Sequence, residues 1–314
     1  MFSNPTAITF VGYLLVMVCV GFYAYYHTRS YGDYILGGRM PIHDWEMPDD
    51  RTRSYGDYIL GGRSLGGFVT ALSVGASDMS GWLLMGLPGA VYLAGISQSW
   101  IGIGLVLGSY INWCVVASRL RVYTEKTHNA LTLPDYFSHR FEDKQNLLRI
   151  IAAVVILLFF TIYCASGVVA GARLFENTFS MSYETALILG AAATICYVFV
   201  GGFLAVSWTD TIQALLMCLA LIVTPIAVMY DLGGFTAATE CVASVDIKML
   251  NILEGHTLVG IVSLLAWGLG YFGQPHILVR FMATRSIKVI PNARRVATLW
   301  MSFCLSGAVA RSPR

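Results

Sequence analysis

The sequence predicts an all-α polytopic membrane protein, and three observations carry this prediction. The 314-residue chain is 56% hydrophobic and only 12% charged, with a mean hydropathy of +0.66, which excludes an ordinary soluble globular domain. Apolar runs of about 18 residues or more, enough to cross the hydrocarbon core of a bilayer, recur along the chain. Glycine and polar residues interrupt two of these runs, at 75–81 and 268–275.

Seven of the apolar runs are long enough to span a membrane. They cover residues 7–26, 65–92, 100–117, 150–172, 183–203, 212–229 and 257–274. The first has no basic segment before it and no small-residue cleavage site after it, so it is interpreted as a retained span rather than a signal peptide. The last run, 296–310, holds only about fifteen residues, and we therefore expect about seven complete spans plus a partial eighth.

The distribution of basic residues predicts the orientation of these spans. If the N-terminus lies outside and the spans alternate, sixteen lysine and arginine residues fall in inner segments. Only Arg173 and Lys248 then fall in outer segments. Because cytoplasmic loops carry the excess of positive charge, this bias places the N-terminus outside and the first long loop inside.

The first interrupted run contains Asp78, which is the only acidic residue well inside a long apolar run. An ionised carboxylate near the bilayer centre costs several kcal/mol, so it requires a cation or a proton. Gly75, Ser77, Ser80 and Gly81 flank it with small residues that lower the cost of unwinding a helix, and unwound carbonyls can bind a small hard cation. The alternative is a protonated Asp78 that hydrogen-bonds to a neighbouring helix.

The second interrupted run has three glycines and a proline within residues 267–275, which disfavours a continuous helix. Trp267, Tyr271 and Pro275 recur at positions i, i+4 and i+8, so we expect them on roughly one helix face. An aromatic surface with a polar tip suits a small, partly apolar ligand. The alternative is that these aromatic residues only pack against neighbouring helices.

The two interruptions together predict a transporter. Broken spans at corresponding places in two halves are typical of proteins built from inverted repeats, with the binding site near the midplane between them. In such a site the N-terminus of a half-helix can face a substrate carboxylate, while carbonyls at the other break hold the cation.

Several long motifs carry a resemblance to a known family. They are Ala76–Ala90, which reads Ala-Ser-Asp-Met-Ser-Gly-Trp-Leu-Leu-Met-Gly-Leu-Pro-Gly-Ala, together with Leu131–Phe137, Tyr163–Gly167, Gly201–Phe203 and Trp267–His276. These motifs resemble the sodium/solute symporter family, and within it most closely the members that carry proline. The resemblance extends over nearly the whole chain, apart from one insertion and the extreme C-terminus.

The resemblance implies an inverted-repeat, LeuT-like fold with five spans in each repeat. The implied organisation is a first span (1–27), a cytoplasmic loop (28–64), the first repeat (65–230), an outer loop (231–255) and the start of the second repeat (256–314). The final run ends at Ala310 before Arg311-Ser312-Pro313-Arg314. We therefore expect the chain as given to be a C-terminally truncated and inactive fragment.

The resemblance also implies a function, sodium-coupled symport of L-proline, and the residues that perform it. The implied sodium site uses the carbonyls of Ala76 and Met79, the side chain of Ser80 and the charge of Asp78. The implied substrate site has Ser77 and Trp82 close by, and its pocket is formed by Trp267, Tyr271 and Pro275. Tyr163 either offers its hydroxyl to the substrate pathway or is satisfied between helices.

Two further residues are candidates for the permeation path. Arg63 is expected at its cytoplasmic mouth, or else is an ordinary positive-inside arginine. Asp210 follows the Gly201-Gly202 turn and either helps ions to pass or caps the next helix. Arg63 also ends a twelve-residue segment, Thr52–Arg63, that repeats Thr28–Arg39 exactly, which indicates a local duplication or a gene-model error.

Other functions are weaker interpretations of the sequence. A sodium symporter of another small solute and a transporter-derived sensor domain remain open. The chain has no His-Glu-x-x-His or Gly-x-Ser-x-Gly motif and its seven cysteines form no CxxC pair, so neither an enzyme nor a zinc site is indicated. We expect no cofactor other than Na⁺ as coupling ion, no nucleic acid and no obligatory protein partner. The expected location is a bacterial cytoplasmic (inner) membrane.

Overall fold

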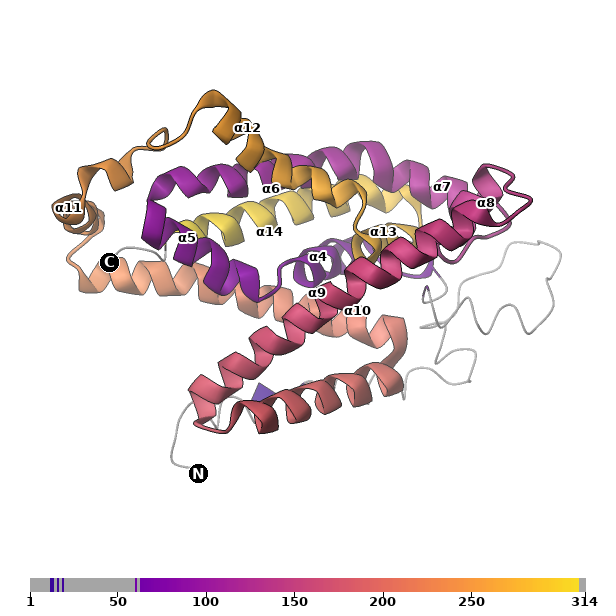
Figure 1. Ribbon diagram of the computed structural model, residues 1–314, viewed down its shortest axis with the longest axis horizontal. Coiled ribbons are helices and arrows are strands. Elements are labelled where there is room, and N and C mark those ends of the chain that lie inside the picture. The colour runs from indigo at the N-terminus through magenta and orange to yellow at the C-terminus, as the bar shows by residue number, and fades with distance from the viewer. Residues whose placement is uncertain (1–11, 14–15, 17–18, 20–59, 61–62, 311–314) are drawn as a thin grey trace.

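The computed structural model describes residues 12–13, 16, 19, 60 and 63–310, and this part of the chain is helical, with one isolated β-bridge between Leu65 and Thr284. Figure 1 shows the arrangement of the helices. Their bounds are α4 Gly67–Asp78, η2 Trp82–Gly86, α5 Leu87–Ala94, η3 Ile96–Gln98, α6 Ser99–Asn112, η4 Trp113–Ala117, α7 Ser118–Lys126, α8 Leu133–Arg140, α9 Leu147–Phe179, α10 Tyr183–Asp231, α11 Phe235–Val245, η5 Ile247–Leu250, α12 Leu258–Leu265, η6 Ala266–Phe272, α13 Pro275–Met282, η7 Ile287–Val289 and α14 Ile290–Ala310.

Within the described residues, three helical segments are long and apolar enough to cross a membrane: 96–126, 147–179 and 202–231. Two bent helix pairs raise this number to five if each pair forms one span. The first pair, 67–78 and 82–94, bends by 62°, and the second, 258–272 and 275–282, bends by 46°. Both breaks that the sequence predicts are therefore confirmed, and the described part of the all-α fold agrees with the prediction.

The α10 segment consists of two arms that meet at Gly202. This glycine has φ 58° and ψ −171°, a backbone conformation that residues with a Cβ rarely adopt. The predicted turn at Gly201-Gly202 is thus confirmed. Asp210, however, lies inside the second arm rather than at its start, so the prediction that it caps a helix is wrong.

Helix α4 lies at the centre of the packed core. Residues Thr70 to Gly75 are buried, and α4 packs against α10, α13 and α14. The ring of Trp300 on α14 lies directly against Gly75, where a Cβ would overlap it. Gly75 stays inside the helix, so its small size serves this close packing rather than the predicted unwinding.

The sequence contains two Gly-x-x-x-Gly motifs in apolar helices, one on α6 and one on α9, and they differ in what lies against them. Gly104 and Gly108 on α6 bring its backbone against Leu265 and Gly268 of the second broken span, and a Cβ on either glycine would overlap that backbone. Such small-residue spacings let helix backbones approach closely, and this motif does so. The corresponding motif on α9, at 167 and 171, has no described atom within 4 Å of the Cβ positions, so it has no packing partner among the described residues.

The segment between α7 and α9 contains one short helix, α8. Helix α8 starts after Thr132, whose side chain accepts a hydrogen bond from the Asp135 amide at 3.2 Å. Asp135 in turn pairs with Arg149 on α9 at 2.9 Å. The first copy of the duplicated segment lies outside the described residues, as does most of the second copy and most of the run 7–26.

Candidate functional site

The first broken span ends its helix at the predicted acidic residue. Asp78 is the last residue of α4, and Met79 leaves the helical region with φ −78° and ψ 80°. Ser80 is also outside the helix, and helical structure resumes at Gly81, followed by η2. The break is therefore confined to two residues, which is shorter than the predicted stretch 75–81.

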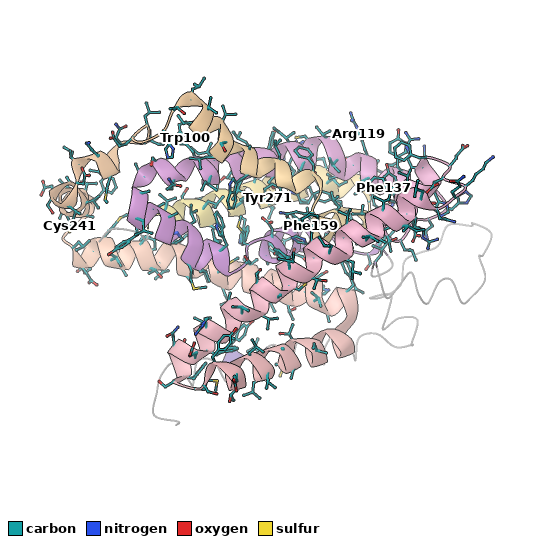
Figure 2. All side chains as sticks on the ribbon, viewed as in Figure 1. Trp100, Arg119, Phe137, Phe159, Cys241 and Tyr271 are labelled. Atoms are coloured by element: carbon teal, nitrogen blue, oxygen red, sulfur yellow. The ribbon has the colours of Figure 1, made fainter. Side chains whose placement is uncertain are left out.

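The second broken span meets the first at this point. The Tyr271 hydroxyl donates a 2.5 Å hydrogen bond to the carboxylate of Asp78, across 193 residues of sequence. The side chain of Gln274 lies close enough to interact with this carboxylate. Tyr271 lies midway along the long axis of the molecule, between Cys241 near one end and Phe137 near the other (Figure 2). The breaks of the two spans thus form one polar cluster inside the bundle.

Tyr163 connects helix α9 to the same cluster. Its hydroxyl donates a hydrogen bond to the Ser77 carbonyl at 3.2 Å. Its ring stacks on His276, with centroids 5.3 Å apart and an interplanar angle of 21°. The Ser77 hydroxyl bonds the Ser73 carbonyl at 2.7 Å within α4, so the Ser77 side chain is already used inside its own helix.

The aromatic residues of the second broken span do not share one face. Tyr271 is 2% exposed, whereas Trp267 is 52% exposed and stacks on Trp82 with centroids 5.4 Å apart. The prediction assumed α-helical spacing, but η6 is a 3-10 helix, in which a step of four residues turns by roughly 120° relative to the start. Pro275 lies beyond the break as the first residue of α13. The exposed Trp267 and the partly buried Trp82 thus form a separate aromatic wall beside the polar cluster.

A buried ion pair lies between α4, α10 and α13. Arg280 donates to Asp210 at 2.8 Å and to the Ser73 hydroxyl at 2.7 Å, and that hydroxyl donates to Asp210 at 2.7 Å. The side chains of Arg280 and Asp210 are only 8% and 13% exposed. Arg280 also donates to the His276 carbonyl at 2.6 Å, next to the break in the second span. Every polar group of this triad therefore has a partner.

Arg63 lies apart from this cluster, at the start of the first broken span. It donates to the side chains of Asn129 and Thr124 at 3.1 and 3.0 Å, and to the carbonyls of Met282 and Ala130 at 2.9 and 3.2 Å. Burial lowers the pKa of Arg63 to about 10, so the guanidinium stays charged at neutral pH. The arginine thus ties the entry to α4 to the end of α7 and to α13.

Sequence reasoning missed three residues near the breaks: Ser73, Arg280 and His276. The sequence does not single out Arg280, although a charge just after a broken apolar run could have marked it. Both ring nitrogens of His276 are buried and have no hydrogen-bond partner among the described residues. The same holds for the Oε1 atom of Gln274. These atoms are available to a ligand. The described residues contain no group of three His, Cys, Asp or Glu that could hold a metal ion.

The site residues predicted for sodium lie together along the first break. Ala76 and Asp78 are in the last turn of α4, Met79 is buried at the break, and the Ser80 hydroxyl accepts a hydrogen bond from the Trp82 amide at 3.3 Å. A carboxylate, a hydroxyl and backbone carbonyls are oxygen donors, which suit a hard cation. A helical bundle with two broken spans that meet at a partly buried carboxylate is the architecture of a secondary transporter.

Comparison with known proteins gives the family. The model of the Sodium:solute symporter family matches residues 58–312, and the chain belongs to this family. It is 60% identical over 308 residues to the "Sodium/proline symporter" of Escherichia coli K12, which covers 98% of this chain and 57% of that protein. The Haemophilus influenzae and Staphylococcus aureus (strain JH9) proteins of the same name are 54% and 47% identical, over 98% and 97% of this chain and 57% and 55% of theirs.

A solved structure shows the same fold. It is the substrate-bound outward-open state of a Na⁺-coupled sialic acid symporter, with a TM-score of 0.71 and 18% sequence identity, over 96% of this chain and 58% of that one. The chain thus spans somewhat more than half the length of the relatives that it matches.

Proposed function

We propose that the protein performs sodium-coupled symport of L-proline across the plasma membrane. The observation that carries this proposal is the 60% identity to a sodium/proline symporter over 98% of the chain, which includes both broken spans. Coupled transport needs no covalent chemistry, which agrees with the transporter names of the relatives.

In this proposal sodium binds at the first break. The carbonyls of Ala76 and Met79, the Ser80 hydroxyl and the Asp78 carboxylate supply oxygen ligands and the compensating negative charge. Sodium then orders the end of α4, and the substrate binds a site that has already lost part of its conformational freedom. The hydrogen bond from Tyr271 to Asp78 supports this coupling, because it connects the sodium residues to the second broken span.

Proline binds beside the sodium site in this proposal. Trp267, Tyr271 and Pro275 contact the substrate from the second broken span, while Trp82 extends the aromatic wall by its stack on Trp267. Ser77 and Tyr163 contribute through their shared hydrogen bond at the end of α4. An apolar wall next to a few polar groups suits a small, compact amino acid.

The path to the cytoplasm then runs past Asp210 and Arg63, and the N-terminus lies outside. Asp210 is buried next to α4, and Arg63 fixes the inner end of the same span. We further propose that residues 65–230 form the first inverted repeat and that the second begins near residue 256, in a bacterial cytoplasmic membrane.

The test uses a chimera, because the chain covers 57% of its Escherichia coli relative. Residues 1–310 replace the matching part of that relative in cells that lack proline uptake. We expect sodium-stimulated proline uptake, its loss in Asp78→Asn at unchanged membrane level, and partial recovery in Asp78→Glu. Asp231→Asn, at the far end of α10, serves as the matched carboxylate control.

Two results would refute this proposal. Uptake by Asp78→Asn that retains its full sodium dependence would remove Asp78 from the sodium site. Competition by another small solute that is stronger than competition by proline would assign the chain to a different substrate.

A further inference from the structure

Helices α10 and α14 run side by side in a parallel register. The Trp300 indole on α14 donates a 2.9 Å hydrogen bond to the Ala214 carbonyl on α10. Two turns further along both helices, Gly307 lies directly against the backbone of Leu221, where a Cβ would overlap the Leu221 carbonyl. These two contacts fix the distance between α10 and α14 in the stretch that lies between the contacts.

Two cysteines face each other in that intervening turn. Cys304 on α14 and Cys218 on α10 lie between these two contacts, four residues after Trp300 and Ala214 and three before Gly307 and Leu221, so their thiols are close enough to interact. Cys304 is fully buried, Cys218 is partly buried, and both are free thiols. Neither takes part in the sodium or substrate site, so the chemistry of this pair is not accounted for by transport.

Two sulfur atoms in apolar surroundings select a particular class of ligand. Thiolates bind soft cations, whereas the tetrahedral sites of zinc require four ligands, and the described residues offer no third His, Cys, Asp or Glu. Soft d10 cations accept two sulfurs in a linear arrangement. The charge of the product decides among them, because an uncompensated charge in an apolar interior is costly.

A divalent cation leaves the pair uncharged. Mercuric chloride and two thiols give one bis-thiolate complex, Hg(SR)₂, and two molecules of HCl, so two S–H bonds and two Hg–Cl bonds break while two Hg–S bonds form. A monovalent cation bound by two thiolates would leave one negative charge buried. We propose that Cys218 and Cys304 form a two-sulfur binding site for a soft divalent d10 cation of the Hg(II) class.

An ion at this site would join parts of the protein that move in transport, a consequence that rests on the proposed function. Cys218 lies in the first proposed repeat and Cys304 in the second, and alternating access moves one group of helices against the other. Trp300, one turn from Cys304, packs on Gly75 of α4. A bridge at the cysteine pair would therefore stop transport without touching the sodium or proline residues.

The test measures mercury retention by the purified 314-residue chain. The reduced chain is treated with mercuric chloride and washed with excess monothiol, which removes mercury held by one sulfur but not mercury chelated by two. We expect one retained mercury per chain, its loss in Cys218→Ser and Cys304→Ser, and its full retention in the exposed control Cys19→Ser. Alkylation after denaturation should show residues 218 and 304 as the protected pair.

Cys218→Ala serves as a second variant, and the unfolding midpoint of each variant confirms that it is folded. Equal retention by folded Cys218→Ser or Cys218→Ala and by the unaltered chain would overturn the site, as would complete loss of mercury from the unaltered chain. In the chimera, mercury should block proline uptake, a dithiol should restore it, and Cys218→Ser should resist the block. Unimpaired uptake with mercury retained would overturn the inference that mercury at this site stops transport. Absence of uptake before mercury is added would refute only the proposed function.

Discussion

The hydroxyl of Tyr271 and the carboxylate of Asp78 are 2.5 Å apart and join the two broken spans at their breaks. The aspartate ends the helix of the first span, and the tyrosine lies in the last turn before the break of the second. A hydrogen bond to a charged group that is shielded from water is worth more than one at the surface. The contact therefore holds the two breaks in register and also adjusts the charge that a cation would meet.

Tyr271→Phe tests this contact, because it removes only the hydroxyl. We expect the free energy of unfolding to fall by about 1.5–3 kcal/mol, since the partly buried Asp78 carboxylate loses a hydrogen-bond donor. The measurement is denaturant unfolding of the purified chain in detergent, with the 84% exposed Tyr230→Phe as control. If both variants unfold at the same denaturant concentration, the hydrogen bond does not stabilise the fold.

Gly108→Ala tests the contact between α6 and the second broken span. The new methyl group would overlap the Gly268 carbonyl, so the helices must separate, and we expect a loss of about 1–3 kcal/mol in unfolding free energy. The matched control is Gly167→Ala on α9, in the same sequence motif but with no described atom near its Cβ position. That control should gain stability, by about 0.5–1 kcal/mol, because alanine favours the helix. Equal effects would contradict the packing seen at Gly108.

The sequence was sufficient to predict both breaks, because their cause is local. Ser80 and Gly81 beside Asp78 in one run, and glycines with Pro275 in the other, disfavour a regular helix whatever packs around them. The turn at Gly202 was predictable for the same reason. Residues at these breaks could therefore be chosen as site candidates before any contact was known.

Other features could not be predicted, because they depend on distant partners. The sequence offers Asp210 as a helix cap or as an aid to ion passage, yet its partner Arg280 is 70 residues away and on another span. The separation of Trp267 from Tyr271 follows from a 3-10 helix, whose spacing the sequence does not distinguish from an α-helix. Equally, the two Gly-x-x-x-Gly motifs look alike in sequence and differ only in what lies opposite them.

Trp267→Ala tests the aromatic wall and rests on the proposed transport of proline. Loss of the stack on Trp82 removes an aromatic pair worth about 0.5–1.5 kcal/mol beyond its buried area, so we expect the KM for proline to rise by about three- to tenfold. Trp208→Ala is the matched control, because both tryptophans are 52% exposed. A KM for Trp267→Ala equal to that of Trp208→Ala, measured in the chimera, would show that the wall does not contact substrate.

The ion pair between Arg280 and Asp210 makes the strongest prediction for stability. Removal of one partner leaves the other charge buried, at a cost of about 3–5 kcal/mol, and we expect Arg280→Gln and Asp210→Asn each to reduce the unfolding free energy by an amount in this range. The double variant removes both charges together. It should therefore lose clearly less than the sum of the two single losses, since no unpaired charge remains.

Denaturant unfolding of all four proteins in the same detergent closes this double-mutant cycle. The exposed pair Arg173 and Glu176 on α9 is the control, because its charges stay in contact with solvent and its cycle should show no measurable coupling. Additive losses at Arg280 and Asp210 would mean that the two charges do not stabilise one another. Ser73 would then be the partner that stabilises each buried charge, because its hydroxyl forms a hydrogen bond with both side chains.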